Sequence, residues 1–342
     1  MRSTMAAVML AVAAFGGVGE GTRPSDPSRF EFRQTHMGSE FKIVLYTTRE
    51  AEARRASDSA FARIAALDKA LSDYDTESEL MRLCDRAGGP PVAVSADLFT
   101  CLERAQAMSA SSGGAFDATI GPVGRLWRRA RRNRVLPDPE TLAKARSLVG
   151  YRAVELDAKA RTVRLAKAGV KLDLGGIAKG FACDEAMAAL KRQGITSALV
   201  AGAGDIVCSA PPPGESGWRV GVAAPDGDPA QPSRFVSVRD ASVSTSGDAE
   251  RFVVIDGTRY GHIVDPATGV CITLRASVTI VAKDGATADS LATAAFVLGP
   301  ERGLRLIEDQ GASGLFVVAG ELPGTFASRR WAEIDWQRSR PK

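Results

Sequence analysis

The sequence predicts an α+β fold in which antiparallel sheets are flanked by helices. Helical periodicity dominates several long segments, whereas short runs of strand-forming residues gather in the second half of the chain. The chain has 342 residues, of which 45% are hydrophobic and 25% are charged. These proportions are typical of a globular protein with a sizeable core, and they exclude a chain that is disordered throughout.

The elements of the first half follow from local patterns. Residues 41–46 (FKIVLY) are rich in strand formers, which predicts a strand. Residues 50–71 carry apolar residues and alanines at helical spacing, which predicts a long amphipathic helix. Helices are also predicted at residues 97–108 and, opening with a proline that a first helical turn tolerates, at 139–148. Residues 151–173 form short alternating runs (AVELD, TVRLA and VKLDL), which predict a β-meander.

The second half mixes strands with helices. Helices are predicted at residues 177–193, 287–298 and 301–309. Strands are predicted at residues 197–201, 218–223, 235–238, 243–245, 252–255, 278–281 and 315–318. Two proline-containing stretches, at residues 211–214 and 226–232, are typical of surface loops rather than of linkers between domains.

The N-terminus is typical of an export signal. Arg2 precedes an apolar run at residues 5–15, and small residues follow the run. The run is shorter than the roughly 20 apolar residues that span a bilayer, and it has the length of a signal-peptide core. A disordered or expression-related tail is the alternative interpretation. We therefore expect a signal peptide or N-terminal anchor at residues 1–21, and an exported protein in the periplasm or at the extracytoplasmic face of the cell membrane.

Charge and composition exclude several kinds of site. The net charge of +4 is too small to indicate a nucleic-acid partner, and we interpret the basic cluster at residues 127–134 as a solvated helix end. With only His36 and His262, one chain cannot form a three-histidine metal site. The five cysteines include no Cys-x-x-Cys, which argues against a zinc ribbon or a dithiol redox centre. Isolated buried thiols are the preferred interpretation, and disulfides are the alternative.

The segment KLDLGGIAKG at residues 171–180 is typical of an anion site. Its pattern predicts a buried strand that ends at Asp173, a turn at Gly175 and Gly176, and a helix that begins directly after the turn. Such a helix N-terminus can bind a phosphate or a cation-bridged diphosphate, and Lys179 could reach the same anion. A plain strand-to-helix turn with a surface lysine explains this segment equally well.

A second segment, GATADSLATA, offers oxygen ligands for a metal. Asp289 and Thr293 are spaced i, i+4, so they share one face of a predicted helix. Carboxylate and hydroxyl oxygens are hard ligands that suit Mg²⁺, which leaves room for water and phosphate oxygens. For this pair in isolation, the simpler interpretation is that Asp289 complements the helix dipole in the first turn and Thr293 packs.

Other candidate ligand contacts lie in turns and loops. His262 ends a predicted hairpin strand before a strong turn signal (DPATG), and near a diphosphate it could act as a general base. A loop holds Phe116, expected to be buried, and Asp117, whose carboxylate could bind a ligand. Met37, expected just before the first strand, and Tyr74 could flank a flat aromatic ring. Taken singly, each of these residues is more simply explained as a core or loop residue.

Eight motifs, in their order along the chain, resemble those of the ApbE family of flavin transferases, the FAD:protein FMN transferases. The motifs are HMGSEF, LSDYDTESEL, GAFDATIGPVGRLW, KLDLGGIAKGFACD, ALVAGAGDI, VSTSGD, RYGHIVDPATG and DGATADSLATA. The resemblance runs from about residue 32 to residue 318. It implies an ApbE-like, T-fold-related architecture in one catalytic domain at residues 30–330, either undivided or made of two subdomains.

The resemblance also implies a reaction. Members of the family bind FAD and Mg²⁺, cleave the diphosphate, join FMN through its phosphate to a threonine of a target protein, and release AMP. Their acceptors carry a short Asp-Gly-x-Thr-type motif. The targets are typically subunits of exported or membrane redox complexes of the Nqr and Rnf types, so the resemblance implies a protein partner and an association with the inner membrane.

The resemblance assigns candidate site residues to this chain. The positions that match the FAD contacts of the family are Met37, Tyr74, Ala115, Phe116, Asp117, Asp173, Lys179, His262 and Ile263. The positions that match the metal ligands are Gly176 (through its carbonyl), Asp289 and Thr293. Other members carry Ala, Ser or Thr at the position of Gly176, a change that a backbone ligand tolerates. His262 is the expected base for the threonine hydroxyl, and Asp289 is the competing choice.

Two other functions stay open at this point. A Mg²⁺-dependent FAD diphosphatase would use water in place of the threonine and would release FMN and AMP, with the same fold and ligands. A non-catalytic flavin-binding protein would need neither a metal clamp nor a base, so the presence of Asp289, Thr293 and His262 argues against it.

Overall fold

The computed structural model describes residues 26–225, 232, 234–247, 252–320, 323–334 and 336–338. The signal peptide or anchor predicted at residues 1–21 lies outside these ranges. Within them, no helix combines the length and the hydropathy that crossing a membrane requires.

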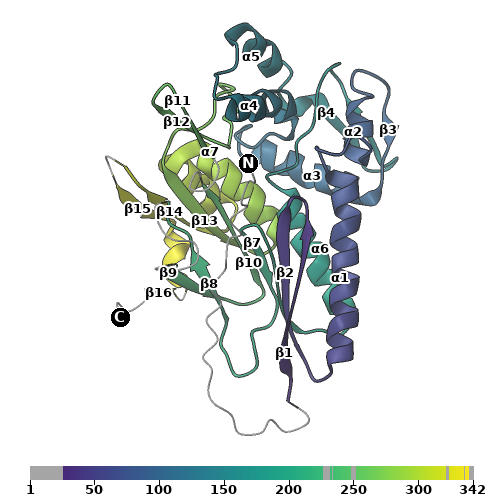
Figure 1. Ribbon diagram of the computed structural model, residues 1–342, viewed down its shortest axis with the longest axis vertical. Coiled ribbons are helices and arrows are strands. Elements are labelled where there is room, and N and C mark those ends of the chain that lie inside the picture. The colour runs from purple at the N-terminus through teal and green to yellow at the C-terminus, as the bar shows by residue number, and fades with distance from the viewer. Residues whose placement is uncertain are drawn as a thin grey trace.

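An eight-stranded sheet forms the centre of the molecule (Figure 1). Its order is β1-β2-β6-β7-β10-β13-β14-β15, and every neighbouring pair is antiparallel. The strands are β1 (Ser28–His36), β2 (Ser39–Thr47), β6 (Ser197–Gly202), β7 (Asp205–Cys208), β10 (Ala241–Gly247), β13 (Ala276–Ala282), β14 (Ser313–Val318) and β15 (Gly324–Ala327).

Different elements bury the two faces of this sheet. Along β2, Ile43 and Leu45 join the core on one face and Val44 joins the core on the other, because successive strand side chains point to opposite faces. Three helices cover the first face: α1 (Glu50–Leu71), α6 (Ala178–Arg192) and α7 (Gly285–Asp309). A smaller sheet of β8 (Trp218–Val222), β9 (Arg234–Val238) and β16 (Trp336–Arg338), with the short helix Arg329–Glu333, covers the second.

A further group of elements lies beside these layers, and Figure 1 shows α2, α4 and α5 at one end of the long axis. The group contains α2 (Glu79–Cys84), α3 (Ala96–Ser111), α4 (Gly121–Asn133), α5 (Pro139–Arg146) and the small sheet β3 (Val92–Ala93), β5 (Thr162–Leu165), β4 (Val154–Asp157). Helix α4 packs against the segment that follows the hairpin of β11 (Phe252–Ile255) and β12 (Thr258–Gly261). There the indole N–H of Trp127 donates to the Gly269 carbonyl at 2.7 Å.

The α+β prediction is confirmed, and several elements match closely. Helix α1 covers residues 50–71 and β11 covers residues 252–255, as predicted. The two helices expected before and after residue 300 are the halves of α7, which breaks at Gly299 (φ 74°) ahead of Pro300. A proline removes a backbone N–H and clashes with the preceding turn, which is why the break falls there.

The predicted β-meander is wrong at its end. Strands β4 and β5 pair, but residues 166–173 form no strand, and Asp173 therefore does not end one. Val170 and Leu172 are buried in alternation, as in a strand. Their backbone is held instead by isolated hydrogen bonds, such as that from the Asp173 N–H to the Ala118 carbonyl at 2.8 Å. The alternating apolar pattern at these residues therefore reflects burial in a core rather than pairing in a sheet.

Two further elements, β1 and the full extent of α4, are not predicted from the sequence. Strand β1 is mostly exposed or half-buried, so it lacks the apolar pattern that predicts a strand. Helix α4 begins near Pro122 and buries Val123, Trp127 and Ala130 on one face. The basic cluster is thus one end of a packed helix, whose arginines at 125, 129 and 132 are exposed.

All five cysteines are free and buried, which confirms the preferred interpretation. Burial raises the pKa of Cys101 and that of Cys271 to about 12, so little reactive thiolate forms at neutral pH.

We expect Ellman's reagent to modify the thiols of the native protein only slowly, and to modify all five thiols promptly after denaturation. A reductant should leave the melting temperature unchanged. A melting temperature that falls in reductant would instead reveal a disulfide.

Candidate active site

Helices α6 and α7 cross at a pair of glycines. A Cβ atom added to Gly180 would lie 2.1 Å from the Gly285 carbonyl oxygen, and one added to Gly285 would lie 2.4 Å from the Gly180 carbonyl oxygen. Both distances are far below van der Waals contact, so only glycine permits this approach. Because each glycine lies in or near the first turn of its helix, the crossing brings the two N-termini together.

Each helix also donates backbone N–H groups to a carboxylate of the other. Asp184 on α6 accepts from Gly285 at 2.6 Å and from Ala286 at 2.9 Å, and Asp289 on α7 accepts from Gly180 at 3.1 Å. First-turn N–H groups have no partner within their own helix, so these carboxylates satisfy them. Asp289 is the fifth residue of α7. It therefore complements the N-terminus of α6 rather than that of its own helix, which corrects the simpler interpretation given above.

A buried charge cluster surrounds Asp289. Lys179 Nζ lies 3.0 Å from Asp205 Oδ2 and 3.7 Å from Asp289 Oδ2, and Asp205 Oδ1 accepts a hydrogen bond from Ser244 Oγ at 2.6 Å. Burial alone would lower the pKa of Lys179, but the two carboxylates raise it above its usual range. Burial, reinforced by Asp205, raises the pKa of Asp289. One ammonium beside two carboxylates leaves a negative balance, which favours an additional cation.

Hard oxygen donors lie beside this cluster. Thr293 follows Asp289 by one turn of α7, and a Cβ atom on Gly176 would lie 2.9 Å from Thr293 Oγ1. Ser246 Oγ is 3.5 Å from the same hydroxyl. In the described part of the chain, no group of three or more His, Cys, Asp or Glu side chains is arranged to hold a metal. A cation here would therefore use carbonyl, hydroxyl and substrate oxygens beside one carboxylate, a donor set that fits Mg²⁺.

A second cluster is built around Arg128 of α4. Its Nη1 lies 2.7 Å from Asp73 Oδ2 and 3.4 Å from Asp173 Oδ2, and its guanidinium lies 4.9 Å from the ring centroid of Tyr74. Tyr74 is 78% exposed, and the cation–π contact with Arg128 holds one face of its ring against α4. Asp173 Oδ1 also accepts from the Gly175 N–H at 2.9 Å. This bond joins the second cluster to the glycine turn before α6.

Phe116 lies against the same glycine turn. It is 4% exposed, and its ring carbon Cε2 would lie 3.2 Å from a Cβ atom on Gly176. Ala115, the preceding residue, is half-buried. The structure thus brings together five predicted residues near the start of α6, which are Gly176, Lys179, Asp289, Thr293 and Phe116.

Asp117 is buried and its carboxylate has internal partners. Oδ1 accepts from the Thr119 N–H at 2.8 Å and from the Thr119 hydroxyl at 2.6 Å, and Oδ2 accepts from the Tyr151 N–H at 2.8 Å. The side chain caps the short helix Ala118–Ile120. These bonds give Asp117 a role in shaping the loop, and its contact with a ligand stays a prediction.

Met37 occupies a turn rather than the approach to the first strand. With Gly38 it joins β1 to β2, at φ values of 50° and 67°. A positive φ is unusual for methionine, and the Met37 N–H donates to Asp68 Oδ2 of α1 at 2.8 Å, which holds the turn in place. Its side chain packs against the main core. The expectation that Met37 precedes the first strand is therefore corrected, because β1 comes before it.

His262 follows β12 directly and is half-buried, and the next residue, Ile263, is 9% exposed. The Ile272 N–H donates to the Ile263 carbonyl at 2.8 Å. The predicted turn is closed by a hydrogen bond of the same length from the Gly269 N–H to the Asp265 carbonyl. These bonds fix the backbone that carries the imidazole.

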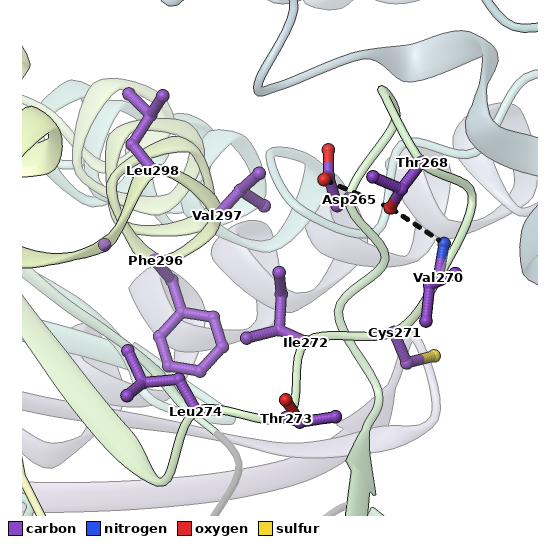
Figure 2. A pocket seen from close by; sticks show the side chains of 11 residues that line it. Asp265, Thr268, Val270, Cys271, Ile272, Thr273, Leu274, Phe296, Val297 and Leu298 are labelled. Carbon is purple, nitrogen blue, oxygen red and sulfur yellow. Dashed lines mark hydrogen bonds between the residues drawn. The ribbon is translucent and has the colours of Figure 1, made fainter.

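A pocket of about 330 Å³ lies between this loop and the end of the first half of α7 (Figure 2). Its lining includes the apolar side chains of Ile272, Leu274 and Phe296. At its edge the Thr268 hydroxyl donates to Asp265 at 3.1 Å. None of the predicted site residues lines the pocket. The predicted site is therefore recognised by its charged groups and its oxygen donors, and not by this pocket.

Sequence reasoning misses four residues of the two clusters, which are Asp73, Asp205, Ser244 and Arg128. Asp73 lies in the motif LSDYDTESEL, next to Tyr74. Asp205 and Ser244 lie in the motifs ALVAGAGDI and VSTSGD, so a signal was present without an assigned role. Asp248, the last residue of the second motif, lies outside the described residues. Arg128 lies in the basic cluster, where nothing in the sequence distinguishes it from its exposed neighbours.

Known proteins resemble this chain over most of its length. A FAD:protein FMN transferase of Treponema pallidum (strain Nichols) is 37% identical over 318 residues, which are 88% of this chain and 87% of the relative. A protein of the same name from Klebsiella pneumoniae (strain 342) is 32% identical over 289 residues, with 83% and 88% covered.

Solved structures agree with these relatives. The flavin transferase ApbE from Vibrio cholerae superimposes with a TM-score of 0.81 at 27% identity, over 90% of this chain and 99% of that one. The ApbE protein from Thermotoga maritima gives 0.80 at 30% identity, with the same coverage. The model of the ApbE family matches residues 37–316. This chain belongs to the ApbE family.

Proposed function

We propose that this chain is a Mg²⁺-dependent FAD:protein FMN transferase. It would cleave FAD, attach FMN by a phosphoester bond to a threonine of an acceptor protein, and release AMP. The observation that carries the proposal is that Lys179 lies beside Asp289, while the Gly176 backbone lies against the Thr293 hydroxyl, at the start of α6. An ammonium group and a divalent cation side by side suit a diphosphate.

The chain offers contacts for the diphosphate and for the flavin half of FAD. Lys179 would bind the diphosphate. Tyr74 and Asp173, both held by Arg128, and Phe116 would lie along the flavin half. The proposed contacts are the nine predicted positions, which are Met37, Tyr74, Ala115, Phe116, Asp117, Asp173, Lys179, His262 and Ile263.

The metal would be held by the Gly176 carbonyl, the Asp289 carboxylate and the Thr293 hydroxyl. Bound there, Mg²⁺ would neutralise charge on the diphosphate and on the leaving AMP phosphate. Lys179 supplies further positive charge from its place between Asp205 and Asp289. The aspartates in turn keep the lysine protonated, so it can act as a fixed cation.

The proposed transfer forms one phosphorus–oxygen bond and breaks another. The threonine hydroxyl attacks the phosphorus of the FMN half, the bond to the bridging oxygen breaks, and that oxygen leaves with AMP. The hydroxyl proton must go to a base. His262 is the proposed acceptor, because imidazole can take a proton at neutral pH. Asp289 is the competing choice, and its place among the metal donors makes it the weaker base.

Two alternatives use the same residues. A FAD diphosphatase would give free FMN and AMP, and a flavin-binding protein would give neither. Asp289 argues against mere binding, because burying a carboxylate at 3% exposure beside a second one costs stability that a simple binder has no need to lose.

We also propose where and with what the enzyme acts. The acceptor would be a redox subunit of the Nqr or Rnf type with a threonine-containing motif. An export signal or anchor at residues 1–21 would place one catalytic domain, residues 30–330, in the periplasm or on the outer face of the inner membrane. No role in binding nucleic acid is proposed.

The test is a reaction of the purified protein with FAD, Mg²⁺ and an acceptor domain that carries an Asp-Gly-x-Thr-type motif. We expect the acceptor to gain the mass of FMN in equal amount to the AMP released, and a chelator to abolish both. A Thr→Val acceptor is the control. AMP with free FMN and an unmodified acceptor would favour the diphosphatase, and bound FAD without AMP would favour the binding protein.

A further inference from the structure

The carboxylate of Asp205 is buried, and both of its oxygens have partners. It is 4% exposed and stands at the start of β7, directly after a turn at Ala203 and Gly204 with φ values of 57° and 130°. Ser244 lies opposite it on β10 and donates to its Oδ1 at 2.6 Å. One oxygen is thereby anchored, and the other faces Lys179 at 3.0 Å.

Lys179 forms ion pairs with two carboxylates, and Asp205 is the nearer of the two. Its ammonium is 3.0 Å from Asp205 and 3.7 Å from Asp289. The near oxygen of Asp289, Oδ2, accepts the Gly180 N–H at 3.1 Å. The other oxygen, Oδ1, accepts no hydrogen bond from any residue in the described part of the chain. Asp289 therefore keeps one carboxylate oxygen open.

We propose that Asp205 is a positioning residue that holds the Lys179 ammonium away from Asp289, so that Asp289 stays open to a divalent cation. The inference rests on the proposed metal role of Asp289. An ammonium and a divalent cation compete for the same carboxylate, because each neutralises it. A second carboxylate, closer to the ammonium than Asp289 is, reduces that competition and keeps the lysine in the site for the substrate.

Removing the Asp205 charge should therefore weaken metal binding. In Asp205→Asn, the ammonium is left with Asp289 as its one carboxylate partner in the cluster and shifts toward it. We expect the dissociation constant for Mg²⁺ to rise at least tenfold. Ser244→Ala, which frees one oxygen of Asp205, should raise it about threefold. Transfer by Asp205→Asn should recover to within about threefold of the wild type when Mg²⁺ is raised, because the affinity for the metal is what changes.

The measurement is a titration of the full-length, FAD-free protein with Mg²⁺, followed by the rise in melting temperature that a bound ion produces. This readout does not depend on turnover. Glu185→Gln is the matched control, because it also removes a carboxylate from an ion pair, here the pair between Glu185 of α6 and Arg63 at 2.8 Å. That variant should bind Mg²⁺ as the wild type does.

A double-mutant cycle separates positioning from direct ligation. If Asp205 acts through Lys179, then Asp205→Asn should change Mg²⁺ affinity much less in a Lys179→Met background than in the wild type. An equal loss in both backgrounds would overturn the inference and make Asp205 a metal ligand or a simple source of charge. Wild-type affinity in Asp205→Asn would overturn the inference alone. No Mg²⁺ binding by the wild type would overturn both the inference and the proposed metal role.

Discussion

Asp289→Asn is expected to lower the rate of FMN transfer by about a thousandfold or more. Asparagine keeps the shape of the side chain, and its amide oxygen can still accept the Gly180 N–H that Asp289 accepts at 3.1 Å. It removes the negative charge that the proposed cation needs. Metal stabilisation of a transferring phosphate is worth several kcal/mol, and each 1.4 kcal/mol is about tenfold in rate.

The measurement is the initial rate at which the acceptor gains FMN, together with the melting temperature of each variant. Asp184→Asn is the matched control. Its carboxylate is also buried at the helix crossing but accepts the N–H groups of Gly285 and Ala286 and lies outside the charge cluster. We expect that variant to melt at a lower temperature and to keep its transfer rate within about threefold while folded. An Asp289→Asn enzyme with more than a tenth of the wild-type rate would refute the metal assignment.

The elements that could be predicted are those whose burial is visible in the local pattern. Helix α1 presents one apolar stripe over its whole length, so both of its ends are recognisable. Strand β1 pairs along its full length with β2, but its side chains are exposed or half-buried. Its backbone pairing therefore cannot be recognised from a pattern of buried apolar residues. The run at residues 170–174 shows the converse, because it alternates like a strand and pairs with none.

In the candidate site, too, local features could be predicted from the sequence and long-range contacts could not. The spacing of Asp289 and Thr293 on one helix face and the glycine turn before Lys179 are local features, and the sequence predicts both. The contact between Lys179 and Asp205 depends on the order β6-β7-β10 in the sheet and on how α6 lies over it. Arg128 likewise reaches Asp73 and Asp173 from a helix that sequence reasoning took for a solvated end. Long-range packing, which one sequence does not display, decides these contacts.

Gly180→Ala is expected to be the most damaging single substitution for folding at the site. The added Cβ atom would lie 2.1 Å from the Gly285 carbonyl oxygen and 2.8 Å from Cβ of Asp289. The first contact is with backbone, so no rotation of a side chain can relieve it, and the helices must move apart. Overpacking of this kind costs about 3 kcal/mol or more. We expect the melting temperature to fall by at least about 5 °C.

Gly124→Ala tests whether that loss comes from the clash rather than from the added methyl group. Gly124 also lies in a helix, and its Cβ atom would meet Asp173 Oδ2 at 3.5 Å, an ordinary contact. Replacing a helical glycine by alanine without a clash stabilises by up to about 1 kcal/mol, so this control should melt at or above the wild-type temperature.

In Gly180→Ala, separating the helices also moves Asp289 away from the Gly180 N–H and from Lys179. Gly180→Ala should therefore lose Mg²⁺ binding even below its melting temperature. Unchanged Mg²⁺ binding would show that the crossing of α6 and α7 does not position the metal donors.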